Sequence, residues 1–364
     1  MIIPELPAYL TTLGGADYKG LIISLFAVTA MLSRPFSGKL SDTIGRKPVM
    51  MFGSIVCLIC SVIYPVLSSV AGFLLLRFVH GFSTGFTPTG QTAYISDIIP
   101  AERRGEAMGL LGTAGAVGMA SGPAIGGMLA NRAGLDIMFY CSSAFAIISV
   151  LIIFGMKETL IEKHRFSTRH LLVEKSDLFE RRVWIPCVIM ALCAYSYGAL
   201  FTVIPDFGEY VGIRNKGLLF SCLTVASLLV RLMGGKASDM YGRREVLRIS
   251  TVVMVLAMAI IAFSSTSLQL IVGVSLYGFA QGVTSPTLLA WATDLSPDNR
   301  KGRGVSSLYI CMEFGIGMGA FLSGLVYANQ HEQFDNTFLL CGGLAALAFV
   351  LLLILGKRTR GFSF

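Results

Sequence analysis

Two short segments concentrate charge in a chain where only 14% of the residues are charged. SGKLSDTIGRKP, at residues 37 to 48, and GGKASDMYGRRE, at residues 234 to 245, each place an aspartate four residues before an arginine. Such a carboxylate can pair with the arginine or cap the positive N-terminal end of a neighbouring helix, and Gly38 and Gly45 permit a close approach and a tight turn. We interpret both segments as ionic latches that open when a carboxylate is neutralised. The alternative is a solvated loop that only sets topology, because an exposed ion pair contributes about 0 to 1 kcal/mol.

The predicted latch residues are the glycines, aspartates and basic side chains of both segments, together with an acidic and a basic residue further along the first half. They are Gly38, Asp42, Gly45, Arg46, Lys47, Asp97, Arg104, Gly235, Asp239 and Arg243. We expect Asp97 with Arg103 and Arg104, repeated as Asp294 with Arg300 and Lys301, to extend this arrangement of charges.

The rest of the composition indicates an all-α integral membrane protein. Of 364 residues 54% are apolar, and apolar runs long enough to cross ~30 Å of hydrocarbon as helices recur along the chain. We predict eleven complete spans, near residues 20 to 40, 48 to 67, 71 to 95, 106 to 130, 135 to 156, 184 to 210, 216 to 236, 246 to 264, 268 to 292, 304 to 328 and 334 to 355. Cys57 and Cys60 have CxxC spacing without further ligands, so we predict no metal site.

Basic residues predict the orientation of these spans. Alternating them places both latch segments and most Lys and Arg residues on one side, which the positive-inside rule makes cytoplasmic, as are the termini of the full-length form. The net charge of +8 therefore requires no nucleic-acid partner. Residues 157 to 183 form a cytoplasmic linker, whose apolar positions are compatible with a surface helix and whose charges we expect to be solvated.

An internal repeat organises the chain. A shift of 197 residues superposes the first latch segment on the second, and also Asp97 on Asp294 and Gly118 on Gly315. We infer two parallel six-helix repeats, residues 1 to 156 and 184 to 364. IPELPAY near the start mirrors IPDFGEY at residues 204 to 210, which follows a long helix, so we expect roughly 18 further residues of a first helix upstream.

Ionisable residues inside apolar segments are candidates for proton coupling, because each costs at least ~2.5 kcal/mol at mid-membrane unless it faces water or a partner. The candidates are Glu313, Glu5, Arg77 and Asp206. Glu313 is near the centre of its predicted span and has no cation that the sequence places beside it, so its pKa should be raised and it should carry the proton. A protonated Glu313 that bonds a neighbouring helix is the alternative.

Four motifs resemble the major facilitator superfamily. The first latch segment is similar to its GxxxDxxGRR loop signature, RFVHGFSTG at residues 77 to 85 to its fourth-helix motif, and IIPELPAYL to the outer end of its first helix. GMASGPAIGG resembles the antiporter motif of the fifth helix through Gly118, Gly122, Pro123, Gly126 and Gly127. Those small residues also fit a simple helix-packing seam, with a bend at the proline.

The resemblance implies two six-helix halves around a central cavity lined by the first, fourth, seventh and tenth helices. Glu5 and Arg77 would meet there, and His80 and Gln281 would face it. His80 stands where a Gln is usual and Glu5 where an apolar residue is usual. The antiporter motif is typical of proton-coupled exporters of drugs or metabolites.

We therefore predict a secondary transporter that exports a small amphipathic drug or metabolite in exchange for protons by alternating access. Proton symport of a small polar solute, such as a sugar or an organic acid, and a receptor or scaffold that transports nothing are the alternatives. The sequence has no GxxxxGK[ST] nucleotide-binding loop and no catalytic triad, so neither ATP-driven transport nor an enzyme is expected, and no cofactor. The expected partners are the substrate, protons and the bilayer of the plasma (inner) membrane, with the protein a monomer.

Overall fold

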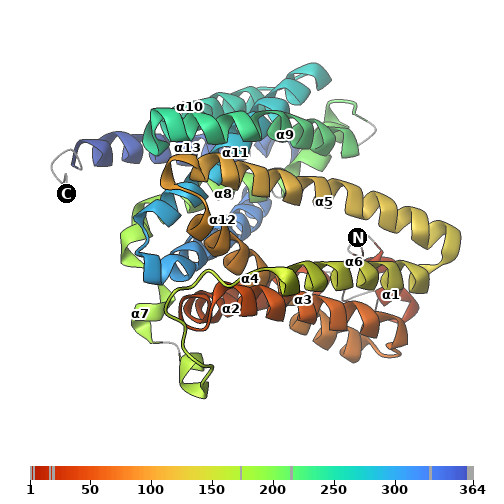
Figure 1. The fold of residues 1–364 in the computed structure, drawn as a ribbon. Coiled ribbons are helices and arrows are strands. Elements are labelled where there is room, and N and C mark those ends of the chain that lie inside the picture. Colours follow the sequence, from red (N-terminus) through yellow and green to blue (C-terminus); the bar gives the residue numbers. More distant parts are fainter. Residues whose placement is uncertain are drawn as a thin grey trace. The chain divides into compact units, whose positions relative to one another are not determined.

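The computed structural model describes residue 2, residues 5 to 15, residue 18, and residues 21 to 358 except 173, 214, 215, 328 and 329. The described residues form helices and turns and contain no β-strand (Figure 1). The predicted all-α class is therefore confirmed.

A long helix coincides with each predicted span. These helices are α2 (Leu21–Thr43), α3 (Arg46–Ile63), α4 (Val70–Ile98), α5 (Arg104–Ala133), α6 (Leu135–Gly155), α8 (Trp184–Tyr210), α9 (Lys216–Tyr241), α10 (Arg243–Ala262), α11 (Ser267–Leu295), α12 (Lys301–Tyr327) and α13 (Phe334–Arg358). Seven helices among the described residues are long and apolar enough to cross a membrane, or eight if a pair bent by 43° within α9 is one span. The full count of eleven spans stays a prediction.

The remaining helices are short. The helix α1 (Leu6–Thr12) precedes the first long helix, and α7 (Lys175–Leu178) lies in the linker with two short 3-10 segments, Thr168–Leu171 and Arg181–Val183. The described residues of the linker thus form no long surface helix.

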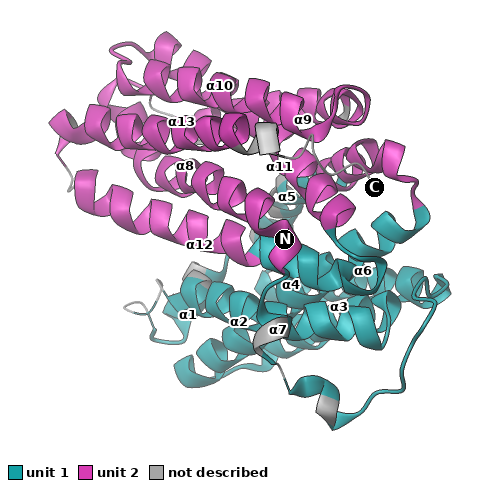
Figure 2. Cartoon of the chain, turned by 90° about the vertical axis from the view of Figure 1, so that its left-hand side faces the viewer, with its two compact units in different colours: residues 1–98, 114–180, 296–309 teal, residues 99–113, 181–295, 310–364 magenta. Residues whose placement is uncertain are grey.

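The chain divides into two compact units, which do not follow the order of the sequence (Figure 2). Unit 1 contains residues 1–98, 114–180 and 296–309, and unit 2 contains residues 99–113, 181–295 and 310–364. The start of α5 thus belongs to unit 2, and the start of α12 belongs to unit 1. The predicted division at residues 156 and 184 remains a description of the sequence repeat.

Helix packing follows the same order in both units. In unit 1, α4 packs between α2 and α3, and α3 also packs against α6; in unit 2, α11 packs between α9 and α10, and α10 against α13. These are the pairs that the shift of 197 residues equates. In unit 2, α8 packs in addition against α13 and α11.

Each unit has an aromatic core, and its outer helix faces are apolar. Tyr9, Tyr64 and Phe139 pack together in unit 1, as do Phe207 and Phe334 in unit 2. Meanwhile the exposed side of α6 consists of large apolar side chains such as those at positions 145, 148, 151 and 152. Soluble proteins rarely expose contiguous apolar patches of this kind, which are typical of a surface that contacts lipid.

Candidate functional site

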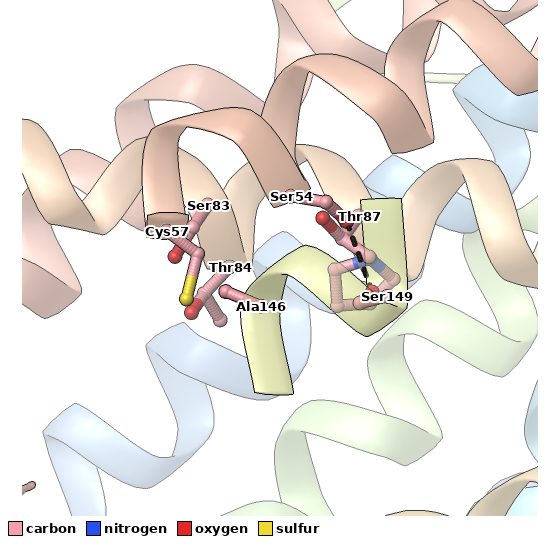
Figure 3. Close-up of a pocket in the computed structure, with 8 residues that line it drawn as sticks. Ser54, Cys57, Ser83, Thr84, Thr87, Ala146 and Ser149 are labelled. Carbon is pink, nitrogen blue, oxygen red and sulfur yellow. Dashed lines mark hydrogen bonds between the residues drawn. The ribbon is translucent and has the colours of Figure 1, made fainter. Parts of the chain in front are cut away.

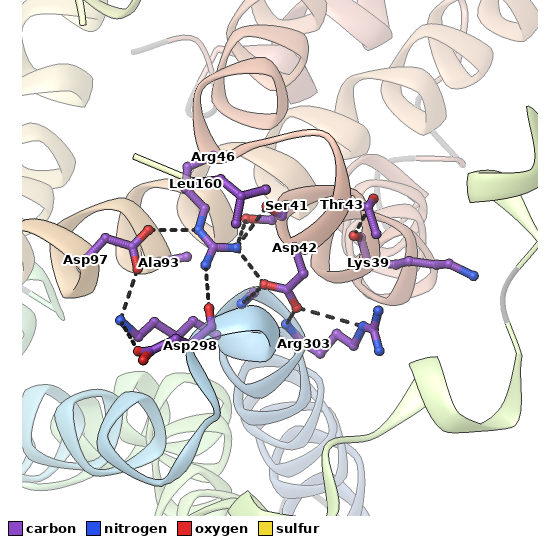
Figure 4. Close-up of polar contacts among 12 residues, drawn as sticks. Lys39, Ser41, Asp42, Thr43, Arg46, Ala93, Asp97, Leu160, Asp298 and Arg303 are labelled. Carbon is purple, nitrogen blue, oxygen red and sulfur yellow. Dashed lines mark hydrogen bonds and ion pairs between the residues drawn. The ribbon is translucent and has the colours of Figure 1, made fainter. Parts of the chain in front are cut away.

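The carboxylate of Asp42 bridges an arginine and a helix N-terminus (Figure 4). Its Oδ1 accepts hydrogen bonds from Arg46 Nη1 at 2.5 Å and from the backbone N–H of Gly302 at 2.7 Å. Its Oδ2 accepts one from the backbone N–H of Arg303 at 2.9 Å. The side chain of Asp42 is fully buried. One carboxylate therefore forms an ion pair and also caps the positive end of α12.

The guanidinium of Arg46 is bonded on every side. Nη1 donates to the carbonyl of Ser41 at 2.8 Å, Nε to Asp97 Oδ2 at 3.0 Å, and Nη2 to the carbonyl of Asp298 at 3.3 Å. Only 1% of the Arg46 side chain is exposed. A buried charge is stable only when it is paired and its donors are used, so this cluster is more than a solvated loop.

Asp97 belongs to the same cluster. It pairs with Arg46 and with Lys301, whose Nζ lies 3.0 Å from Asp97 Oδ1, and not with Arg103 or Arg104. The residues from position 99 to 113, which include Arg103 and Arg104, fold into unit 2. We call Asp42, Arg46, Asp97 and Lys301, with the start of α12, the first latch.

The second repeat forms the matching arrangement within unit 2. Asp239 forms an ion pair with Arg243 and accepts hydrogen bonds from the backbone N–H groups of Gly105 at 2.8 Å and Glu106 at 2.9 Å. Asp239 therefore caps the N-terminus of α5, as Asp42 caps that of α12.

Asp294 completes this second arrangement. Asp294 lies 3.0 Å from both Arg243 Nε and Arg104 Nη1. We call Asp239, Arg243, Asp294 and Arg104, with the start of α5, the second latch. In each latch, residues of one repeat hold the start of a helix from the other repeat.

Two of the predicted glycines lie where the latch helices approach closely. A Cβ atom on Gly38 would lie 2.9 Å from Ser306 Cβ on α12, and a Cβ on Gly235 would contact the carbonyl of Gly105 on α5. Any side chain at either position would push the capped helix away. Lys47 takes no part in the first latch, because its Nζ donates to the carbonyl of Phe154 at 2.7 Å.

The linker also reaches the first latch, so its charges are not all solvated as expected. Asp177 Oδ2 lies 2.6 Å from Lys39 Nζ, and Asp177 Oδ1 lies 3.2 Å from Arg303 Nη1. Burial works to raise the pKa of Asp177, but the hydrogen bonds from Lys39 and from the Glu174 backbone, together with the charge of Arg303, outweigh it and hold the pKa below its ordinary value.

Arg77 on α4 is buried without Glu5 beside it. Its Nε donates to the carbonyl of Ile22 at 3.0 Å, its Nη1 to Tyr64 Oη at 3.3 Å, and its guanidinium stacks 4.6 Å from the centre of the Phe26 ring. His80 is buried in the same cluster, with its Nδ1 3.3 Å from Tyr64 Oη.

The structure does not bring Glu5 to Arg77. Glu5 precedes α1, and its Oε1 points instead to Gly127 on α5, 3.5 Å from where a Cβ would lie. The sequence expectation assumed a common depth in the membrane, but depth does not determine which side of a helix a carboxylate faces.

The other ionisable candidates lie in unit 2 and are far apart. Glu313 is half-buried on α12, with one carboxylate oxygen enclosed. Asp206 near the end of α8 lies close to Tyr327, which is 14 residues beyond Glu313 and hence about 21 Å further along the helix. Gln281 on α11 is also half-buried, and its Oε1 has no hydrogen-bond partner among the described residues.

The glycines of GMASGPAIGG differ from their counterparts in the second repeat. Gly118 on α5 has no described atom within 4 Å of its potential Cβ, whereas Gly315 and Gly319 on α12 abut the backbone of α8 at Ala191 and Tyr195. Gly315 and Gly319 thus form a packing seam against α8, whereas the seam expected at GMASGPAIGG itself stays a prediction. α5 is helical from Gly122 through Gly126, and the side chain of Pro123 lies outside the described residues.

A pocket of about 230 Å³ lies among α3, α4 and α6 in unit 1 (Figure 3). Most of its wall is apolar, although several lining side chains carry a hydroxyl, including Ser83, Thr84 and Ser149, and Cys57 carries a thiol. The counterpart of Cys57 in the second repeat is Met254, which is fully buried. Met254 belongs to unit 2, where α8 packs against α11 and α13. Among the described residues no group of three or more His, Cys, Asp or Glu side chains could hold a metal ion.

Comparison with known families gives the identity of the fold. The sequence model of the Major Facilitator Superfamily matches residues 1–215 and 211–362. The chain belongs to this superfamily. Its members are transporters, so the chain is a multi-pass membrane transporter, and the resemblance inferred from the latch motifs is confirmed.

Several relatives of this superfamily member are drug efflux proteins. The multi-drug resistance efflux pump PmrA of Streptococcus pneumoniae is 26% identical over 92% of this chain and 86% of its own length. The multidrug resistance protein MdtG of Serratia proteamaculans is 30% identical over 79% of this chain and 73% of its own. These similarities place the chain among the drug-transporter families of the superfamily.

Solved superfamily structures share the fold. The human organic anion transporter MFSD10 aligns with a TM-score of 0.77 and 21% identity over 96% of this chain and 89% of its own. The proton:xylose symporter XylE aligns with a TM-score of 0.78 and 13% identity over 98% of this chain and 90% of its own. At these identities the likeness concerns the fold alone.

Proposed function

We propose that this superfamily member exports a small amphipathic drug or metabolite in exchange for protons, by alternating access. The observation that carries the proposal is its similarity to multidrug efflux proteins over most of the chain, including 26% identity over 92% of it to PmrA. The two latches supply the physical means by which one side of such a transporter could be closed and released.

Each latch concentrates several interactions on one aspartate. Neutralising Asp42 removes its ion pair with Arg46 and weakens the cap on the two N–H groups at the start of α12. Breaking one partner of a buried pair costs about 3 to 5 kcal/mol, and a helix cap contributes about 0.5 to 2 kcal/mol. A change of that size is enough to shift a two-state equilibrium by several powers of ten. The latches are therefore suited to hold one conformation of the transporter and to release it cooperatively.

Proton coupling is assigned to Glu313, which is half-buried in a helix with an enclosed carboxylate oxygen. Protonation would allow this carboxyl to move through an apolar environment in one half of the cycle, and ionisation would require water or a cation in the other half. Arg77, Glu5 and Asp206 remain secondary candidates.

The proposal is tested by expressing the protein in a bacterial host that lacks its own efflux pumps. We expect growth in the presence of at least one toxic amphipathic compound from a panel, and no growth with the Asp42→Asn variant. In proteoliposomes with an imposed proton gradient, the same compound should move against its own gradient while a pH-sensitive dye reports opposite proton flux. Accumulation in the direction of proton flow would indicate a symporter. The absence of any solute-dependent proton flux would favour a receptor or scaffold.

A further inference from the structure

Glu158, at the start of the linker, occupies a concave arrangement of backbone N–H groups. Its Oε1 accepts hydrogen bonds from the N–H groups of Arg46, Thr159 and Leu160, each at 2.9 Å. Its Oε2 accepts one from the N–H of Lys47 at 3.0 Å. The linker carboxylate thus caps the N-terminus of α3, where the helix dipole favours a negative charge.

Gly45 makes this contact possible. Its φ of 127° is a backbone conformation that residues with a side chain rarely adopt, and a Cβ atom there would collide with the Glu158 carboxylate. The motif glycine therefore lies against a residue that is more than a hundred positions away in the sequence. The adjacent Thr159 adds to the contact, because its hydroxyl donates to Asp97 Oδ2 at 2.9 Å.

The far end of the linker makes a second contact with the same latch. Asp177 is shared between Lys39 on α2, at 2.6 Å, and Arg303 at the start of α12, at 3.2 Å. Lys39 Nζ also donates to the carbonyl of Leu172 at 2.7 Å, and the N–H of Glu180 donates to Ser307 Oγ on α12 at 2.9 Å. The linker therefore joins the two helices that the first latch holds together.

Within the part of the chain that the structure describes, no corresponding contacts are made to the second latch. Gly242, the counterpart of Gly45, has a φ of 89° but no described atom within 4 Å of its potential Cβ. The residue 197 positions after Glu158 is Leu355, which has no carboxylate. Lys236, the counterpart of Lys39, pairs with Glu106 and is 60% exposed, whereas the Lys39 side chain is 13% exposed.

We propose that the linker is a brace for the first latch, with Glu158 and Asp177 as its positioning residues, so that the first latch opens more slowly than the second. The brace, meaning residues 158 to 160 and 172 to 180, holds α3, the end of α2 and the start of α12 together. The role of the brace in a transport cycle rests on the proposed alternating access, but its effect on the stability of the first latch does not. Opening at the latch end requires that the linker detach from Lys39 and Arg303.

The test is amide hydrogen exchange followed by mass spectrometry on the full chain in lipid nanodiscs, without any substrate. In Glu158→Gln, we expect the segment from 45 to 48 to exchange about tenfold faster, because Arg46 and Lys47 lose a charged acceptor for their N–H groups. In Asp177→Asn, the segment from 301 to 304 should exchange faster. Exchange at residues 104 to 106 and 243 to 246, in the second latch, should stay unchanged in both variants.

Glu162→Gln is the matched control, because Glu162 lies in the same linker and is exposed. It removes the same charge from the linker without removing a contact to the latch, and exchange should match that of the unaltered protein.

Glu158→Asp, whose carboxylate falls short of the α3 N-terminus by one methylene, should give an intermediate rate and covers the case in which Glu158→Gln does not fold. Unchanged exchange at 45 to 48 in a folded Glu158 variant, or an equal increase in both latches, would overturn the brace. A failure to transport any compound would count against the proposed function and leave the exchange result intact.

Discussion

Lys301 and Asp97 form an ion pair, with Nζ 3.0 Å from Oδ1, although 204 residues separate them in the sequence. The counterpart residues Arg104 and Asp294 form the same pair in unit 2, across 190 residues. Each repeat thus supplies an aspartate to a basic residue of the other repeat. This exchange of partners makes the latches sensitive to the relative position of helices that are distant in sequence.

The exchanged partners can be tested by charge reversal. We expect Lys301→Asp to abolish most transport, because it places a second carboxylate beside Asp97 in a buried cluster. Adding Asp97→Lys should restore part of the activity, measured as compound efflux in proteoliposomes. The matched comparison is Asp97→Lys with Arg104→Asp, which pairs residues that are close in sequence but lie in different latches. If Asp97→Lys with Arg104→Asp restored activity and Asp97→Lys with Lys301→Asp did not, the pairing of Asp97 with Lys301 would be wrong.

The two motif aspartates should differ in importance. Asp42→Asn should abolish most transport while membrane insertion stays intact, and Asp239→Asn should have a milder effect. Glu245 directly follows Arg243 and Arg244 and could have replaced Asp239 as their partner, but in the structure it pairs with Arg248. The difference is better explained by burial, because the Asp42 side chain is fully buried whereas that of Asp239 is 7% exposed. Efflux rate and the amount of protein in the membrane fraction measure the two effects. Similar, near-normal transport by both variants would reduce the latches to topological signals.

Glu313→Gln should uncouple the cycle. The neutral amide cannot take up or release a proton, so substrate should still exchange down its own gradient while proton-driven extrusion is lost. Substrate-induced pH change in proteoliposomes separates the two activities. Glu332→Gln is a suitable control, because Glu332 is exposed and lies outside the long helices. Full proton coupling in Glu313→Gln would show that another group carries the proton.

The brace should be insensitive to pH in the neutral range. The pKa of Asp177 lies below its ordinary value, so the stability from its pairs with Lys39 and Arg303 is fully present above the ordinary aspartate pKa of about 3.9. That stability is lost only as the pH falls through the lower, folded-state pKa. We expect exchange at residues 301 to 304, corrected for the intrinsic rate, to be the same at pH 8 and pH 5.5. A marked loosening between these values would show that a different group controls the linker contact.

Much of the architecture could be read from the sequence, because bilayer physics leaves few choices. An apolar run of about 20 residues must be a helix in lipid, and every predicted span coincides with one. The repeat at 197 residues also anticipated that α2, α3, α4 and α6 pack in the same order as α9, α10, α11 and α13. The latch motif itself was found from charges and glycines that stand out against an apolar background.

Only the tertiary structure decided which residues pair. The sequence grouped Asp97 with Arg103 and Arg104 without assigning a partner to each, and it placed Glu5 beside Arg77 because membrane depth was the only available guide. The chain instead passes residues 99 to 113 into unit 2 and residues 296 to 309 into unit 1, so the pairs are exchanged. The contact of Glu158 with the start of α3 was equally invisible, because a carboxylate in a charged linker has the same sequence signature whether it is solvated or buried in a backbone cap. Helix formation depends on local apolar character, whereas an ion pair depends on the position and direction of two side chains, and these are determined only when the whole chain has packed.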